Sequence, residues 1–238
     1  MPQLVPAVVP AGRLGRSEQP SLPVSAGLFL RPWELDDAPF VYEAYQDPSI
    51  QHWTRRRADC EIETREWIAR WRQGWRAETD AHWAMARASD GAVIGWVALC
   101  HLELAVGRAE CRYWVLPSAR GQGVAPAGVS ALAYWALDTV GLHRIEIAHP
   151  MANEAACRVA MKSGFPTEST RRSAQLHADG WHDMHVHARV QQGLDDLPDE
   201  PPPDRALGQV QHRLHRRHRD RLRDRIQGRG RSRPFDSK

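Results

Sequence analysis

The chain has 238 residues, of which 42% are hydrophobic, and a formal net charge of +3. No apolar run approaches the roughly 20 residues of a membrane-spanning helix, which excludes an integral membrane protein, and the N-terminus lacks the features of a secretory signal. Four widely spaced cysteines without a Cys-x-x-Cys pair argue against a zinc ribbon and a disulfide scaffold. We expect a reduced, cytoplasmic protein with one globular domain.

Charge is distributed unevenly along the chain. Residues 205–238 hold 12 basic and 3 acidic side chains, a net charge of +9, which leaves −6 for residues 1–204. Residues 191–204 are acidic and proline-rich and are expected to form a linker. The basic tail, 205–238, is expected to be disordered or an amphipathic helix. Its open interpretations are contact with nucleic acid or the ribosome, contact with an anionic membrane, and an extension without a selected role.

The predicted elements begin after a flexible leader, residues 1–26, which contains five prolines and little periodicity. Hydrophobic periodicity then predicts a strand, two helices, three strands, a helix, a strand, a helix and two strands. Their approximate ranges are 28–31, 40–45, 61–77, 82–87, 92–102, 107–116, 124–140, 143–149, 153–163, 167–176 and 181–190. This mixed order predicts an α+β domain over residues 27–190 with one central sheet of about seven strands. The Trp stripe of the second helix, Trp67, Trp71 and Trp75, is expected to be core.

The most informative segment is a strand that ends at Pro117, a loop with two glycines, and a helix N-terminus. Backbone N–H groups in such a loop can converge on a phosphate, and the helix dipole adds positive potential there. A P-loop is excluded because Gly123 is followed by Val124 and Ala125 instead of Lys and Ser or Thr. A dinucleotide fingerprint is excluded because Pro126 stands where the third glycine belongs.

The run from Arg120 to Ala125 resembles motif A of the GNAT superfamily of N-acetyltransferases, Q/R-x-x-G-x-G/A, with Arg120, Gly123 and Ala125 at the defining positions. Other segments are typical of its RimJ/RimL-type branch, which acetylates protein N-termini and related amines. These segments are Leu30-Arg31-Pro32, Asp47-Pro48, Trp53-Thr54, Gly141 to Glu146, Asn153-Glu154-Ala155 and Ser163-Gly164-Phe165. The resemblance covers about residues 27–190 and implies a GNAT fold, with a mixed, mostly antiparallel sheet flanked by helices.

The resemblance also implies a site for acetyl-CoA and no metal. The pantetheine arm would pair with backbone groups of Trp114, Val115 and Leu116, and Asn153 would help to fix it. The pyrophosphate would be held by the N–H groups of Arg120, Gly121, Gln122, Gly123, Val124 and Ala125. Two departures, Ala156 in place of the usual Ser and the missing amide of Pro126, are expected to lower affinity modestly, since a neutral hydrogen bond contributes ~1 kcal/mol.

Acetyl transfer requires a neutral amine, a stabilised oxyanion and a proton for the leaving thiolate. Glu110 on the predicted fourth strand is the first candidate for the general base, and Glu103 is the second. An equally favoured role for Glu110 is that of a solvated carboxylate that only attracts a cationic substrate. The N–H of Val115 is the expected oxyanion donor. Tyr113 is the candidate general acid.

Four histidines, His177, His182, His185 and His187, lie within eleven residues of the last predicted hairpin. Such pairs can bind a metal, but surface or acceptor-groove histidines are the favoured interpretation, and no metal is expected. The lead function is transfer of acetyl to a primary amine, with a protein N-terminus as acceptor. The alternatives are a small-molecule amine acetyltransferase and a non-catalytic acyl-CoA-binding or interaction protein; a monomer and a homodimer are both compatible.

Overall fold

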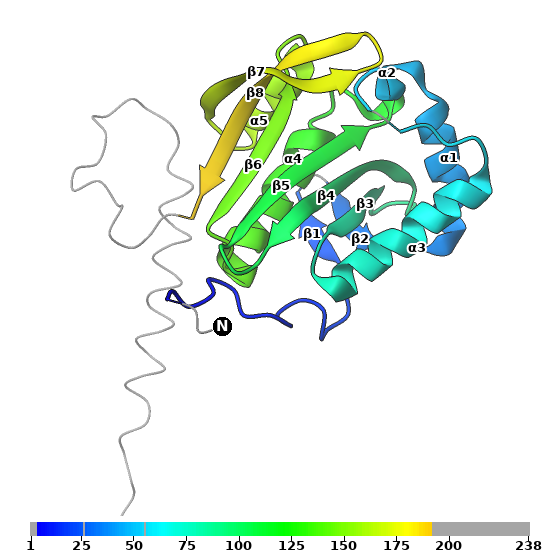
Figure 1. Cartoon of the computed structure of the whole chain (residues 1–238). Helices are drawn as coiled ribbons and strands as arrows, with labels where there is room; N and C mark the ends of the chain where they lie inside the picture. The colour runs from blue at the N-terminus through cyan, green and yellow to red at the C-terminus, as the bar shows by residue number, and fades with distance from the viewer. Residues whose placement is uncertain (1–3, 26, 55, 192–238) are drawn as a thin grey trace, which may run out of the picture. The chain divides into compact units, whose positions relative to one another are not determined.

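The computed structural model describes residues 4–25, 27–54 and 56–191. The predicted basic tail and nearly all of the predicted linker lie outside these residues. An eight-stranded sheet runs through the described part in the order β1-β2-β3-β4-β5-β6-β8-β7 (Figure 1). Its strands are β1 Leu22–Val24, β2 Leu28–Pro32, β3 Ala81–Arg87, β4 Val93–Glu103, β5 Arg108–Val115, β6 Arg144–Pro150, β7 Thr167–His177 and β8 Gly180–Val190. Neighbouring strands are antiparallel except β5 and β6, which are parallel.

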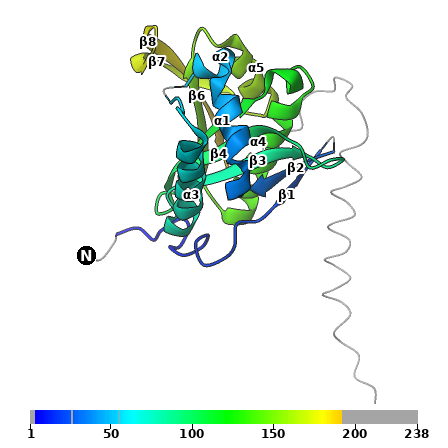
Figure 2. The ribbon, with the colours of Figure 1, turned by 90° about the vertical axis from the view of Figure 1, so that its right-hand side faces the viewer.

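Helices cover both faces of this sheet. They are α1 Ala38–Gln46, α2 Pro48–Gln51, α3 Glu61–Ala77, α4 Val124–Tyr134 and α5 Glu154–Lys162. Helices α1, α2 and α3 gather on one side, and α4 and α5 lie on the other (Figures 1 and 2). None of the helices in the described part of the chain is long and apolar enough to cross a membrane.

Two hydrophobic cores follow from the alternation of side chains along the strands. Strand β5 sends Cys111 and Val115 into the core under α4, and it sends Trp114 into the core under α1 and α3. The α3 core is aromatic, since Trp71 packs against Trp96 there. The predicted Trp stripe is therefore confirmed as core.

The predicted fold class, α+β with a mostly antiparallel GNAT-type sheet, is confirmed, but the sheet has eight strands. The additional strand is β1, which pairs with β2 at Leu22↔Leu30. It lies within the segment predicted to be a flexible leader. The predicted helix over 124–140 is also divided, because α4 ends at Tyr134 and a π-helical turn, Trp135–Val140, continues it.

The prediction of a flexible leader is wrong for residues 4–25. Val9 and Leu14 are buried in the α4 core, with 1% and 3% of their surface exposed. Glu78, at the end of α3, accepts hydrogen bonds from the backbone amides of three leader residues, Gly12, Leu14 and Gly15 (2.6, 2.7 and 3.1 Å). The segment was missed because its contacts are made by isolated apolar residues and backbone groups, which leave no periodic pattern.

Candidate active site

The parallel pair of β5 and β6 separates part of the way along its length. Pairing runs from Arg108↔Arg144 to Glu110↔Glu146 and then stops. Beyond it, β5 pairs only with β4, as in Val97↔Tyr113, while β6 continues against β8. The remaining residues of β5 and β6 are therefore not paired with each other, and we call this unpaired stretch, next to the loop that leads into α4, the opening.

Among the predicted pantetheine partners, Val115 presents its backbone to this opening. The Leu116 N–H donates to Ile94 O, 3.0 Å away, on the β4 side. Because successive residues of a strand direct their backbone groups to opposite sides, those of Val115 point away from β4 and those of Trp114 point toward it. Arg120 Nε donates to Val115 O at 3.2 Å, which leaves the Val115 N–H as the group available in the opening.

The loop before α4 depends on two glycines in the left-handed region. Gly121 has φ +74° and Gly123, the N-cap of α4, has φ +77°. A Cβ at either position would meet no atom within 4 Å, so the backbone conformation is what requires glycine. The N–H groups of Val124 and Ala125 lie in the first helical turn, where no intrahelical acceptor exists. These free N–H groups and the helix dipole give the loop a positive potential, which favours anions.

The start of α5 lies across the opening from β5. The Asn153 Oδ1 caps this helix by accepting from the Ala156 N–H at 3.0 Å. Tyr113 reaches over from β5 and donates from its hydroxyl to Ala156 O, 3.1 Å away. Burial raises the pKa of the Tyr113 phenol, so the hydroxyl stays protonated at neutral pH and can act as a donor.

Glu110 lies on the α1–α3 face of the sheet, where the opening begins. Arg112 holds both of its carboxylate oxygens, with Nε to Oε1 at 2.8 Å and Nη2 to Oε2 at 3.1 Å. A bulge in β4 brings in His101, whose Nδ1 lies 3.3 Å from Glu110 Oε2. Both oxygens of the Glu110 carboxylate are therefore already engaged by Arg112. Glu103 pairs with Arg108 at the far end of β5, away from the opening.

The structure divides the four predicted histidines into two groups. His177 and His182 pack edge-on against Trp53, each with ring centroids 6.3 Å away, so the last hairpin meets the segment after α2. The last hairpin is the segment in which the sequence suggested acceptor-groove histidines. His185 and His187 instead lie on the α5 side of the sheet. There they meet His149, which the β6–β8 register places opposite His185, and Cys157 of α5. The sequence alone does not connect these two residues with the histidine pair, because they lie on separate elements.

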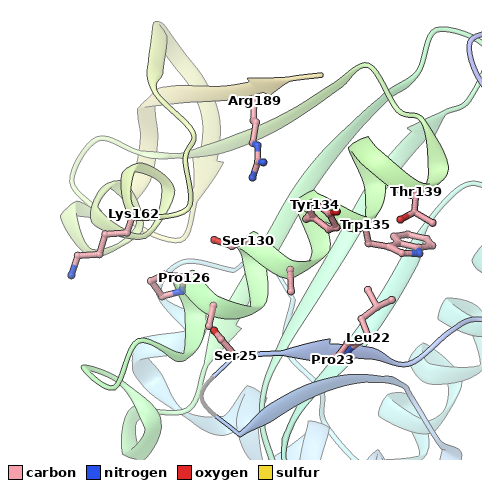
Figure 3. A pocket seen from close by; sticks show the side chains of 12 residues that line it. Leu22, Pro23, Ser25, Pro126, Ser130, Tyr134, Trp135, Thr139, Lys162 and Arg189 are labelled. Carbon is pink, nitrogen blue, oxygen red and sulfur yellow. The ribbon is translucent and has the colours of Figure 1, made fainter. Parts of the chain in front are cut away.

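A hollow of about 750 Å³ lies beside α4 (Figure 3). Pro126 and Ala127 line it at the α4 end near the glycine loop. Arg189 projects from β8 toward α4, and Lys162 extends from the end of α5 (Figure 3). None of its lining residues is acidic, so the hollow suits an anionic group. Its full lining is Leu22, Pro23, Ser25, Pro126, Ala127, Ser130, Ala131, Tyr134, Trp135, Thr139, Lys162 and Arg189.

An opened strand pair beside a glycine loop at a helix N-terminus agrees with the class of fold that motif A predicted. The family model described as Acetyltransferase (GNAT) domain matches residues 27–166, and the chain belongs to this family.

Curated proteins are similar in sequence to part of this chain. The ribosomal-protein-serine acetyltransferase of Escherichia coli (strain K12) is 28% identical over 98 residues, which are 41% of this chain and 55% of that protein. The chain spans about half the length of the curated relatives that it matches.

Solved structures resemble the fold over a longer stretch. One is described as RimL, a ribosomal L7/L12 alpha-N-protein acetyltransferase in complex with coenzyme A; it has a TM-score of 0.68 and 20% identity, covering 72% of this chain and 98% of that chain. Another is the microcin C7 self-immunity acetyltransferase MccE in complex with acetyl-CoA and AMP, with a TM-score of 0.64 and 16% identity over 70% of this chain and 93% of that chain. At these identities the likeness concerns the fold.

Proposed function

We propose that this protein transfers the acetyl group of acetyl-CoA to a primary amine, with the N-terminal amine of a protein as the lead acceptor. The observation that carries the proposal is the β5–β6 opening directly beside the two-glycine loop of α4. Family membership supports the reaction. The name of the relative that acts on ribosomal-protein serine supports a protein acceptor.

In this proposal the cosubstrate lies along the opening. The amides from Arg120 to Ala125 hold the pyrophosphate, Val115 pairs with the pantetheine arm, and Asn153 contacts the arm with its side-chain amide while its oxygen caps α5. The hollow with Lys162 and Arg189 would receive the phosphorylated nucleotide end, since it is the cationic depression that borders α4.

The chemistry needs no covalent enzyme intermediate. The neutral amine attacks the thioester carbonyl, the new C–N bond forms, and the C–S bond breaks to release the thiolate. The Val115 N–H stabilises the oxyanion of the tetrahedral intermediate. Glu110 accepts the amine proton, directly or through water, and the protonated Tyr113 hydroxyl is the candidate donor to the thiolate.

The decisive experiment measures release of the CoA thiol from acetyl-CoA with a panel of acceptors. The panel contains peptides with free N-termini, the same peptides with blocked N-termini, and small polyamines. Turnover with the free peptides alone supports the lead acceptor, whereas turnover with polyamines alone supports the small-molecule alternative. Binding of acetyl-CoA without transfer to any amine would contradict the enzymatic proposal and favour a non-catalytic acyl-CoA-binding protein.

We also place this reaction in a reducing compartment, as expected for the cytoplasm. All four cysteines, Cys60, Cys100, Cys111 and Cys157, are free thiols. Cys100 and Cys111 sit on the neighbouring strands β4 and β5 and are both buried. Burial raises the pKa of the Cys100 thiol to about 12, so it remains an unreactive thiol at neutral pH.

A further inference from the structure

Three histidines and one cysteine form a compact cluster on the α5 side of the sheet. His149 lies near the end of β6, His185 and His187 lie on β8, and Cys157 lies on α5. One ligand atom from each residue, an imidazole nitrogen or the thiol sulfur, lies within 4.8 Å of the others. His149 and His187 are almost completely buried, with 4% and 0% of their surface exposed.

The hydrogen bonds of the two buried imidazoles fix where their protons are. His149 Nδ1 lies 2.8 Å from Pro150 O, and His187 Nδ1 lies 3.0 Å from Phe165 O. A carbonyl oxygen can only accept, so each Nδ1 carries a proton and donates it. In a neutral imidazole the other nitrogen, Nε2, then has a lone pair and no proton.

The two Nε2 atoms face each other at 3.1 Å. Two lone pairs at this distance repel unless a cation or a proton lies between them. A metal cation at this point would accept both lone pairs. Backbone carbonyls that orient two imidazoles toward one point are the usual support of metal-ligating histidines.

The remaining two residues complete a set of four ligands. His185 lies near His149, with ring centroids 5.6 Å apart, and its Nδ1 is buried without a hydrogen-bond partner in the described part of the chain. Cys157 adds a thiol, which becomes a thiolate ligand when it binds a metal. A Cys–His₃ set with Zn–N bonds of about 2.0–2.1 Å would place its nitrogens roughly 3.3 Å apart in a tetrahedron, close to the Nε2–Nε2 distance.

We propose that His149, His185, His187 and Cys157 bind one Zn²⁺ ion in tetrahedral geometry. The ion would join β6, β8 and α5, the elements that flank the opening on the side away from β5. Because four protein ligands leave no open position, the site would be structural. It would hold the N-terminus of α5, with Asn153 and Ala156, in place beside β5.

A second group in the described part contains residue types that can bind a metal: Asp80, His82 and Cys100. We do not propose a metal site there. His82 Nδ1 already accepts from Trp96 Nε1 at 3.2 Å. The ring of His82 is also stacked on Trp71, with centroids 4.9 Å apart. The Nδ1 atom of His82 is thus already hydrogen-bonded within the aromatic core.

Cobalt is the probe for this site, because Co²⁺ replaces Zn²⁺ and has a visible spectrum. The full chain, treated with a chelator and a reductant, is titrated with Co²⁺. We expect one equivalent to produce the strong d–d bands of tetrahedral cobalt and a thiolate-to-cobalt charge-transfer band, both abolished by one equivalent of Zn²⁺. A titration without the charge-transfer band would overturn the proposal; cobalt bound by histidines elsewhere in the chain lacks that band.

Two substitutions and their matched controls identify the ligands. Cys157→Ser should abolish the charge-transfer band, and His185→Asn should weaken cobalt binding, whereas Cys60→Ser and His182→Asn should leave the spectrum unchanged. Retention of the band in Cys157→Ser would overturn the assignment.

Alkylation of the unsubstituted protein tests the site independently of variant folding. Zn²⁺ should protect Cys157 from iodoacetamide while the exposed Cys60 is still modified, as read by mass spectrometry. Equal modification of Cys157 with and without Zn²⁺ would contradict a zinc thiolate. None of these readouts depends on acetyl transfer. A protein without acetyltransferase activity could therefore still bind the metal, and a protein without the metal site could still transfer acetyl groups.

Discussion

His82 on β3 is an imidazole kept neutral inside an aromatic core. It is stacked on Trp71 and Trp96, with ring centroids 4.9 and 5.6 Å away. Burial, with smaller contributions from Arg56 and Arg112, lowers the pKa of His82 to about 3. The unfolded chain, with a His pKa of about 6.5, binds more protons between these values. Stability contributed by the neutral ring is therefore complete above about pH 6.5 and is lost as the pH falls toward 3.

We therefore expect the free energy of unfolding to decrease below about pH 6.5 by up to about 1.4 kcal/mol per pH unit from this residue. His82→Gln keeps an acceptor for Trp96 but does not titrate, so its stability should depend less on pH between 7 and 5. Urea unfolding at several pH values measures this difference. His101→Gln, at an exposed position, is the control; equal slopes in all three proteins would contradict the prediction.

Glu110 is the residue whose chemical role is most open to test. Glu110→Gln should lower kcat roughly 10²–10⁴-fold if the carboxylate is the general base, and it should flatten the acid limb of the pH–rate profile. Glu103→Gln, at the far end of β5, should change neither. An unchanged profile in Glu110→Gln would assign the carboxylate to holding Arg112 instead.

At the scale of elements, the glycine loop and α4 act as one unit. The period-based prediction located both, because a strand, two glycines and an apolar helix are all local signals. It could not show that β5 and β6 separate after Glu110, since that depends on the pairing of residues far apart in the sequence. The bulge that brings His101 to Glu110 was hidden for the same reason.

Gly123→Ala tests the loop as a cosubstrate site. The residue has φ +77° with open space around it, so alanine adds roughly 1–2 kcal/mol of backbone strain and no clash. Gly91→Ala is a matched control, because Gly91 has φ +71° and equal space in the β3–β4 turn. Both variants should lose similar stability, but only Gly123→Ala should weaken acetyl-CoA binding in calorimetry. Equal affinities in the two variants would remove the loop from the site.

At the scale of the whole molecule, the leader is part of the folded unit. A chain that lacks residues 1–19 loses Val9 and Leu14 from the core and the Ser17 carbonyl that accepts from Trp75 Nε1. Burial of two such aliphatic side chains contributes about 3–6 kcal/mol, so we expect a large drop in Tm. A chain that lacks only residues 1–7 should keep its Tm, because Leu4 and Val5 are exposed. Equal Tm values for both chains would contradict this role.

The net charge of the folded unit differs from that of the first 204 residues. Five of the acidic residues in the first 204 positions lie in residues 193–204, so residues 1–192 carry a net charge of only −1. Net charge of the folded unit therefore gives little attraction for a cationic acceptor. Under the proposed function, selection of the acceptor would fall to local contacts, for example near Trp53 and the last hairpin.

The sequence by itself determined the class of fold, the order of the elements and the motif A loop, because helix and strand periods, glycines and caps act over a few residues. Only the tertiary structure decided at which residue β5 and β6 separate, how the leader is buried, and that His149 and Cys157 join His185 and His187. These features arise from strand register and from contacts between distant segments, and such contacts leave no local pattern in the chain.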